Sequence, residues 1–156
     1  MKHSTIAKKF AIAALTTLAL SVSPAAKADD KGCSNASLYG TFADKDTGFI
    51  IPGPNVAPVP FAGVNLITFD GNGNMTATGW GSVGGSTGAQ TETGTYKVNS
   101  DCTGTYSITI NPGGIPAHAF FVMADSLNEL QIIVTDQGNV ITCIARRQFP
   151  VGDWRN

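Results

Sequence analysis

The sequence predicts an all-β domain, and three observations support that prediction. Short runs in which apolar and polar residues alternate extend from residue 60 to residue 149. Clusters of Asp, Asn, Gly, Pro and Ser interrupt these runs about every dozen residues, which is the spacing typical of meanders, sandwiches and barrels. No segment after residue 28 shows sustained helical periodicity. We therefore expect a single antiparallel β domain.

Eight strands are expected between the turn clusters. The first expected strand is followed by a loop at 51–60, because four prolines there cannot donate to a ladder. The second ends at Asp70-Gly-Asn-Gly, a tight hairpin signal, and each later strand ends at a similar cluster. The expected strands are 38–43, 61–69, 75–83, 91–98, 103–110, 115–123, 129–135 and 140–148.

The strand number favours closure of the sheet. A Gly-Thr-aromatic step recurs at Gly40, Gly94 and Gly104, where Gly permits a bend and the aromatic side chain turns inward. Short strands joined by hairpins avoid exposed edges by closing on themselves. The predicted fold is a single antiparallel, eight-stranded up-and-down barrel, and a two-sheet β-sandwich is the alternative.

Residues 1–28 have the pattern of a secretory signal peptide. Lys2, Lys8 and Lys9 precede a mostly apolar stretch at 10–22, and Ala26-Lys-Ala28 has the small residues of a cleavage site. An uncleaved anchor is disfavoured because the stretch is shorter than the ~20 residues that a membrane-spanning helix needs. We predict cleavage after Ala28, export to the periplasm or medium of a bacterium, no membrane span, and one barrel domain over 29–156.

The charge balance after cleavage argues against nucleic acid as a partner. Four of the ten basic residues lie in the signal segment, and none of the eleven acidic residues does. The remaining chain has six basic and eleven acidic residues, a net charge of about −5. A mildly acidic domain without a basic patch is poorly suited to bind nucleic acid. We therefore expect no nucleic-acid partner.

Three cysteines in an exported protein suggest one disulfide and one free thiol. Cys33 precedes the first expected strand and Cys102 lies in a turn, so a regular meander places both at the same end. This position favours the pair Cys33–Cys102, with Cys143 free and buried in the last strand. The pair Cys33–Cys143 remains open if the first strand lies beside the last.

The sequence offers few residues for catalysis or metal binding. His118 is the single histidine after cleavage, which removes His-rich zinc sites, and no Gly-x-Ser-x-Gly nucleophile elbow is present. The segment 70–74 is similar to half of a calcium loop, but Gly81 occupies the position where an EF-hand needs Glu. We interpret this segment as a hairpin turn, expect no metal and no cofactor, and assign no catalytic residue.

The expected function depends on the inward-facing side chains, because an eight-stranded barrel is either filled or holds one small ligand. We expect a binding module for a small apolar or amphipathic molecule. The alternative is a structural or surface interaction protein, and the second alternative is a cyclase- or isomerase-type enzyme with His118, Asn65 and Glu92 as its polar candidates. The lumen candidates are Asn65, Ile67, Phe69, Tyr96, Tyr106, Ile108, His118 and Phe121.

Several motifs resemble a group of small exported bacterial proteins. These motifs are Cys33-Ser-Asn-Ala-Ser-Leu-Tyr-Gly-Thr-Phe42, Phe69-Asp-Gly-Asn-Gly-Asn74, Gly94-Thr-Tyr-Lys-Val98 with Asp101-Cys-Thr-Gly-Thr105, and Ala145-Arg-Arg-Gln148. The resemblance implies a small β-barrel, similar in size and strand count to lipocalin-like and allene-oxide-cyclase-like barrels. It also implies the disulfide Cys33–Cys102, since both cysteines belong to the shared pattern. It supplies no catalytic residue, and Gly40-Thr-Phe42 stands where lipocalins have Gly-x-Trp.

Overall fold

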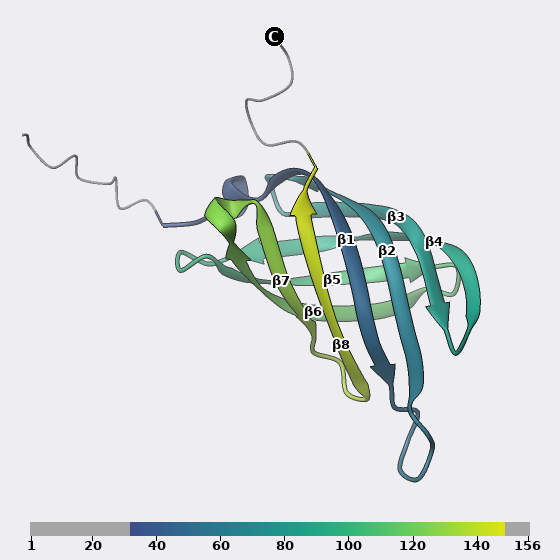
Figure 1. Ribbon diagram of the computed structural model, residues 1–156. Coiled ribbons are helices and arrows are strands. Elements are labelled where there is room, and N and C mark those ends of the chain that lie inside the picture. Colours follow the sequence, from purple (N-terminus) through teal and green to yellow (C-terminus); the bar gives the residue numbers. More distant parts are fainter. Residues whose placement is uncertain (1–31, 149–156) are drawn as a thin grey trace, which may run out of the picture. The chain divides into compact units, whose positions relative to one another are not determined.

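The computed structural model describes residues 32–148, so the predicted signal peptide and its cleavage site lie outside the described residues. Eight antiparallel strands follow one another around a closed barrel in chain order (Figure 1), which confirms the barrel over the sandwich. The strands are β1 (Tyr39–Ile50), β2 (Val59–Asp70), β3 (Asn74–Val83), β4 (Ser86–Val98), β5 (Thr103–Asn111), β6 (Ile115–Ala124), β7 (Glu129–Val134) and β8 (Asn139–Arg147).

The pairing of β1 with β8 closes the sheet. β1 pairs with β2 over its whole length, from Tyr39 opposite Asp70 to Ile50 opposite Val59. On its other side β1 pairs with β8, and Ile50 lies opposite Asn139. Each of the eight described strands therefore has two neighbours, although residues 86–90 of β4 pair with β3 alone.

Three strand boundaries differ from the sequence prediction by two residues or more. β1 continues to Ile50 instead of ending at residue 43, and β4 begins at Ser86 instead of residue 91. β2 begins at Val59, so Pro60 lies within a strand. Pro60 is exposed, and its carbonyl oxygen accepts a hydrogen bond from the amide of Gly84 (2.9 Å). The two extended strands were missed because their added residues are mostly polar, which is typical of loops rather than of a barrel interior.

Large apolar side chains fill one end of the barrel, which we call the closed end. Phe69 makes edge-to-face contacts with Phe42 (5.5 Å between ring centroids) and with Tyr96 (5.1 Å). Such contacts stabilise a core beyond the burial of apolar area alone. The largest fully buried side chains are Phe42, Phe69, Phe121, Leu38 and Leu130.

The segment before β1 completes the closed end. A short 3₁₀ turn, η1 (Asn35–Ser37), leads to the fully buried Leu38. The Tyr96 hydroxyl donates a hydrogen bond to the Leu38 carbonyl (2.8 Å), and the Val98 amide donates one to Asn35 Oδ1 (2.8 Å). These bonds satisfy backbone groups that would otherwise be unpaired beside the core.

A disulfide joins this segment to the turn between β4 and β5. It links Cys33 to Cys102, with the two Cα atoms 4.9 Å apart, which confirms the predicted pair. Cys143 is free and buried in β8, as predicted. A structural disulfide is typical of an oxidising, extracytoplasmic compartment. Within residues 32–148, no helix is long and apolar enough to cross a bilayer.

Candidate functional site

The opposite end of the barrel, beside the loop that joins β1 to β2, contains a cavity of about 210 Å³. Its mouth is apolar, and its deeper part is polar. The apolar side chains at the mouth include Ile50, Phe61, Val83, Ile110, Ile115 and Val134. The polar side chains deeper in the barrel include Asp44, Asp46, Gln90, Glu92 and Tyr106.

Five polar side chains form a hydrogen-bonded layer across the barrel, which we call the acidic floor: Asp44, Asp46, Asn65, Gln90 and Glu92. Asn65 Nδ2 donates to Asp46 Oδ2 (2.9 Å) and lies 3.4 Å from Asp44 Oδ2. Gln90 Nε2 donates to Asn65 Oδ1 (2.9 Å) and to Glu92 Oε1 (3.2 Å). The two amides therefore hold three carboxyl groups in one layer.

Burial shifts the proton affinity of two of these carboxyl groups. Desolvation, followed by the charge of Asp46, raises the pKa of Asp44 to about 9. The same two causes raise the pKa of Glu92 to about 7. Lys45 is exposed, and the Arg147 guanidinium lies 4.6 Å over the Phe42 ring at the closed end. Neither cation offsets the buried negative charge, so the floor favours either protons or an external cation.

Cys143 completes the polar part of the cavity. Burial first, and then the neighbouring Asp46, raise the pKa of its thiol above the ordinary value. Possible metal-ligand atoms of Asp44, Asp46 and Cys143 lie within 4.8 Å of one another. A thiol that keeps its proton is a poor metal ligand, because metals bind the thiolate.

Two glycines on the inner face make room for the acidic floor. A Cβ atom added at Gly63 would lie 2.7 Å from Asp46 Oδ2, and one added at Gly79 would overlap Asn65 Oδ1. Gly63 and Gly79 are neighbours of these side chains on β2 and β3. The absence of a side chain at both positions lets Asp46 and Asn65 lie flat against the barrel wall.

The structure places the predicted lumen residues in three environments. Ile67, Tyr106 and Ile108 line the cavity, and Asn65 belongs to its floor. Three more, Phe69, Tyr96 and Phe121, are buried in the core. Phe121 stacks on Tyr106 with 6.5 Å between ring centroids, so this pair lies where the cavity meets the packed core.

His118 lies on the outward-facing side of β6, at the cavity mouth. Its Nδ1 is 2.7 Å from Asp136 Oδ1, and its backbone amide donates to Asp136 Oδ2 (2.6 Å). The ring therefore helps to fix the mouth, near the turn between β7 and β8, and does not contact the acidic floor.

Sequence reasoning missed Asp44 and Asp46, the two carboxyl groups that β1 contributes. The expected first strand covers residues 38–43 and the expected loop covers 51–60, so neither carboxyl group is placed in a strand. A signal was present, because Phe42, Asp44, Asp46 and Ile50 share one phase of the strand alternation. Gln90 was missed for the same reason, since the expected fourth strand began at residue 91.

The predicted turn at 70–74 is confirmed. Asp70 Oδ1 accepts hydrogen bonds from the amides of Asn72 (2.7 Å) and Asn74 (2.9 Å). A hydrogen bond from the Asn74 side chain, followed by these two backbone bonds, lowers the pKa of Asp70. The carboxylate is thus used to close the hairpin between β2 and β3.

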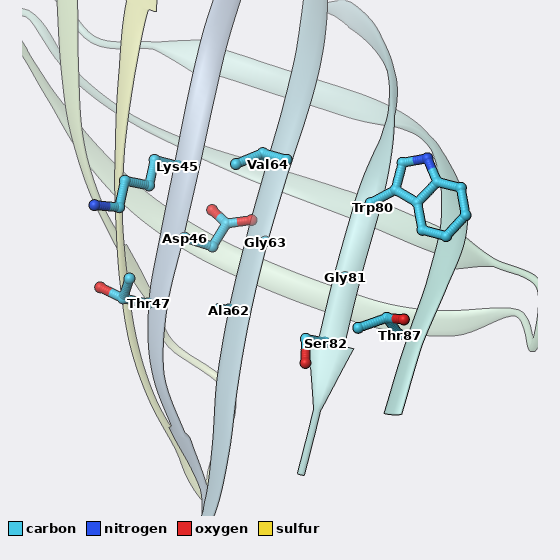
Figure 2. A pocket seen from close by; sticks show the side chains of 10 residues that line it. All are labelled: Lys45, Asp46, Thr47, Ala62, Gly63, Val64, Trp80, Gly81, Ser82 and Thr87. Atoms are coloured by element: carbon cyan, nitrogen blue, oxygen red, sulfur yellow. The ribbon is translucent and has the colours of Figure 1, made fainter. Parts of the chain in front are cut away.

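A second concavity lies on the outside of the barrel and has a volume of about 400 Å³. Figure 2 shows its lining on β1 to β4, with the Trp80 ring at one side. Trp80 and its cross-strand partner Val64 are 60 % and 58 % exposed. The Asp46 carboxylate lies beside Gly63 and borders both this groove and the interior cavity. The wall of the barrel is therefore thin at this position.

No protein-family model matches this chain, and no curated protein or solved structure matches it either. The resemblance to small exported bacterial barrels therefore stays a prediction, and the function is argued from the site alone.

Proposed function

We propose that this protein is an exported binding protein that takes up a small amphipathic molecule through the open end of the barrel. The observation that carries the proposal is the cavity of about 210 Å³, in which an apolar mouth leads to a polar, hydrogen-bonded floor. Cavities of mostly apolar lining with a few placed polar groups are the usual sites for small ligands.

The apolar mouth and the polar floor contribute differently to ligand binding. The aliphatic and aromatic side chains at the mouth remove the apolar part of the ligand from water, which supplies affinity. The floor supplies specificity, because a buried carboxyl or amide that loses its partner is costly. Binding of a purely apolar molecule would leave the floor without new partners, so an amphipathic ligand fits better.

The signal-peptide pattern and the Cys33–Cys102 disulfide together support a location outside the cytoplasm. We place the protein in the periplasm or the medium of a bacterium, after cleavage at Ala28. A binding protein there meets small molecules before they enter the cell.

Native mass spectrometry of the protein, purified from its own periplasm or medium, tests the proposal. We expect a co-purifying molecule on the wild type and its loss from Ala117→Trp, which fills the cavity from β6. Trp80→Ala removes the outer-face aromatic and serves as the matched control, which should keep the adduct. An adduct that survives Ala117→Trp but disappears from Trp80→Ala would instead support the surface interaction role.

A second candidate function is catalysis of the cyclase or isomerase type. Glu92 lies in the cavity with its pKa raised to about 7, and Asn65 lies in the same floor. A carboxyl group with a pKa near the working pH is suited to general acid–base catalysis. Incubation of the identified ligand with the protein would then change the ligand's structure, and Glu92→Gln would abolish that change without preventing binding.

A further inference from the structure

We infer that the ligand carries a cationic head group, an ammonium or guanidinium on a short apolar body, and that this head group binds among Asp44, Asp46 and Glu92. The inference rests on the proposed function, since it names the chemistry of the molecule that the cavity binds. It follows from the charges, the unpaired atoms and the donors that face the floor.

The ionisable groups deep in the cavity are carboxyl, phenol and thiol groups, none of which can carry a positive charge. Residues 32–148 contribute no lysine or arginine side chain to the cavity lining. The titratable groups that face it are Asp44 and Asp46 from β1, Glu92 from β4, Tyr106 from β5 and Cys143 from β8, with His118 and Asp136 at the mouth. Three carboxyl groups thus share a site that contains no counter-charge, which is costly unless protons or a cation compensate them.

One oxygen of the floor has no partner. Asp44 is only 8 % exposed, and its Oδ1 is buried without a hydrogen bond, although the side chain lines the cavity. The nearby amide donors of Asn65 and Gln90 already serve Asp46, Asn65 and Glu92. The floor therefore has acceptors in excess, and a ligand that brings donors would complete it.

An ammonium group matches this arrangement. It offers three N–H donors and no acceptor, and a guanidinium offers five. A carboxylate head group would add a fourth acidic group to the same site, and a hydroxyl would bring a single donor without charge. The apolar walls at the mouth then surround the body of the ligand, as the proposed function requires.

A metal ion fits the floor less well. Among the described residues, Asp44, Asp46 and Cys143 offer three ligand atoms within 4.8 Å of one another, one fewer than a structural zinc site uses. A metal ion would also have to displace the proton of the buried Cys143 thiol, whose pKa is raised. An ammonium makes contacts of about 2.7–2.9 Å to carboxylate oxygens and needs no thiolate.

Binding of a cation would displace protons from the floor. Below pH 6 Asp44 and Glu92 are largely protonated, and a bound positive charge favours their ionised forms. The affinity for an amine should therefore rise between pH 5 and pH 8, with net proton release. The affinity for a neutral alcohol of the same chain should change little over this range.

Three ligands with one common tail test the inference: hexylamine, hexan-1-ol and hexanoate. Isothermal titration of the disulfide-bonded protein at pH 8 should show the amine binding at least about tenfold more tightly than the alcohol, because hydrogen bonds between charged groups are roughly twice as strong. Hexanoate should bind more weakly than the alcohol. Titrations in buffers of different ionisation enthalpy should show protons released by the amine alone.

Glu92→Gln and Asp44→Asn each remove one ionisable carboxyl group and keep the side-chain shape. Either variant should reduce the preference for the amine and leave the affinity for the alcohol nearly unchanged, so one folded variant is sufficient. Equal or tighter binding of the alcohol or of hexanoate would overturn the cationic head group and leave the binding function standing. Absence of binding by all three ligands would overturn both proposals. Tight binding of zinc chloride that is lost in Cys143→Ser would overturn the inference, because it would show that the floor binds a metal ion and not an amine.

Discussion

Replacement of Glu92 by glutamine should stabilise the folded protein above pH 7 and leave its stability at pH 4 nearly unchanged. Burial raises the pKa of this carboxyl group from its ordinary 4.5 to about 7. At about 1.4 kcal/mol for each tenfold change in proton affinity, ionisation of the buried group costs the folded state about 3 kcal/mol at pH 8. Glutamine avoids this cost, and its amide oxygen can still accept the hydrogen bond from Gln90.

The direction of the pH dependence follows from the raised pKa. The folded state binds the proton more tightly than the unfolded state, so the stabilising contribution is fully present below pH 4.5. It is lost as the pH rises through about 7. The free energy of unfolding of the wild type should therefore fall between pH 5 and pH 8, and that of Glu92→Gln should fall less. Asp44, whose pKa rises from 3.8 to about 9, loses its own contribution across that range in both proteins, so the difference between the two curves isolates Glu92.

Urea denaturation of the disulfide-bonded proteins at pH 4, 6 and 8 measures both curves. Glu129→Gln is the matched control, because Glu129 accepts a hydrogen bond from Arg146 (2.8 Å) that lowers its pKa. This control should gain no stability at pH 8. Parallel curves for the wild type and Glu92→Gln would refute the reasoning, since they would show that Glu92 has the same pKa in both states.

Four further substitutions or treatments test the fold. Phe121→Ala should lower the free energy of unfolding by about 3–5 kcal/mol, because the ring is fully buried; a loss below 1 kcal/mol in urea titration would contradict this. Cys102→Ser opens a link between residues 69 positions apart and should cost up to about 4 kcal/mol, measured against the reduced wild type as control. The thiol of Cys143 should resist Ellman's reagent until the protein unfolds, and fast reaction in native buffer would be inconsistent with its burial. Gly79→Ala should weaken binding and lower the melting temperature, because the added methyl overlaps the floor.

The sequence favoured the observed strand count, closure and disulfide, while it left the two-sheet sandwich and the pair Cys33–Cys143 open as alternatives. Turn clusters such as Asp70–Asn74 can be recognised from a few neighbouring residues, because the Asp70 side chain itself accepts the hydrogen bonds of the turn. Strand number and the positions of Cys33 and Cys102 then follow from regular alternation. These features depend on neighbours in the chain, which a single sequence contains.

The acidic floor could not be predicted in the same way. Alternation assigns apolar residues to the interior, but here Asp44 and Asp46 occupy inward positions of β1. Their partners Asn65 and Gln90 come from other strands and approach them only after the barrel closes. The separation of the lumen into a packed end and a cavity depends in the same way on side-chain volumes around the whole barrel, for example on Gly63 and Gly79.

The segment with Asn35 and Leu38 completes only the closed end, so the two ends of the barrel differ. A ligand bound as proposed among Asp44, Asp46 and Glu92 would enter head first and keep its tail directed to the mouth. Each methylene that is removed from water adds about 0.8 kcal/mol, but a methylene beyond the mouth adds nothing. Affinity in a series of lengthening tails should therefore reach a plateau, and the chain length at that plateau reports the depth of the cavity.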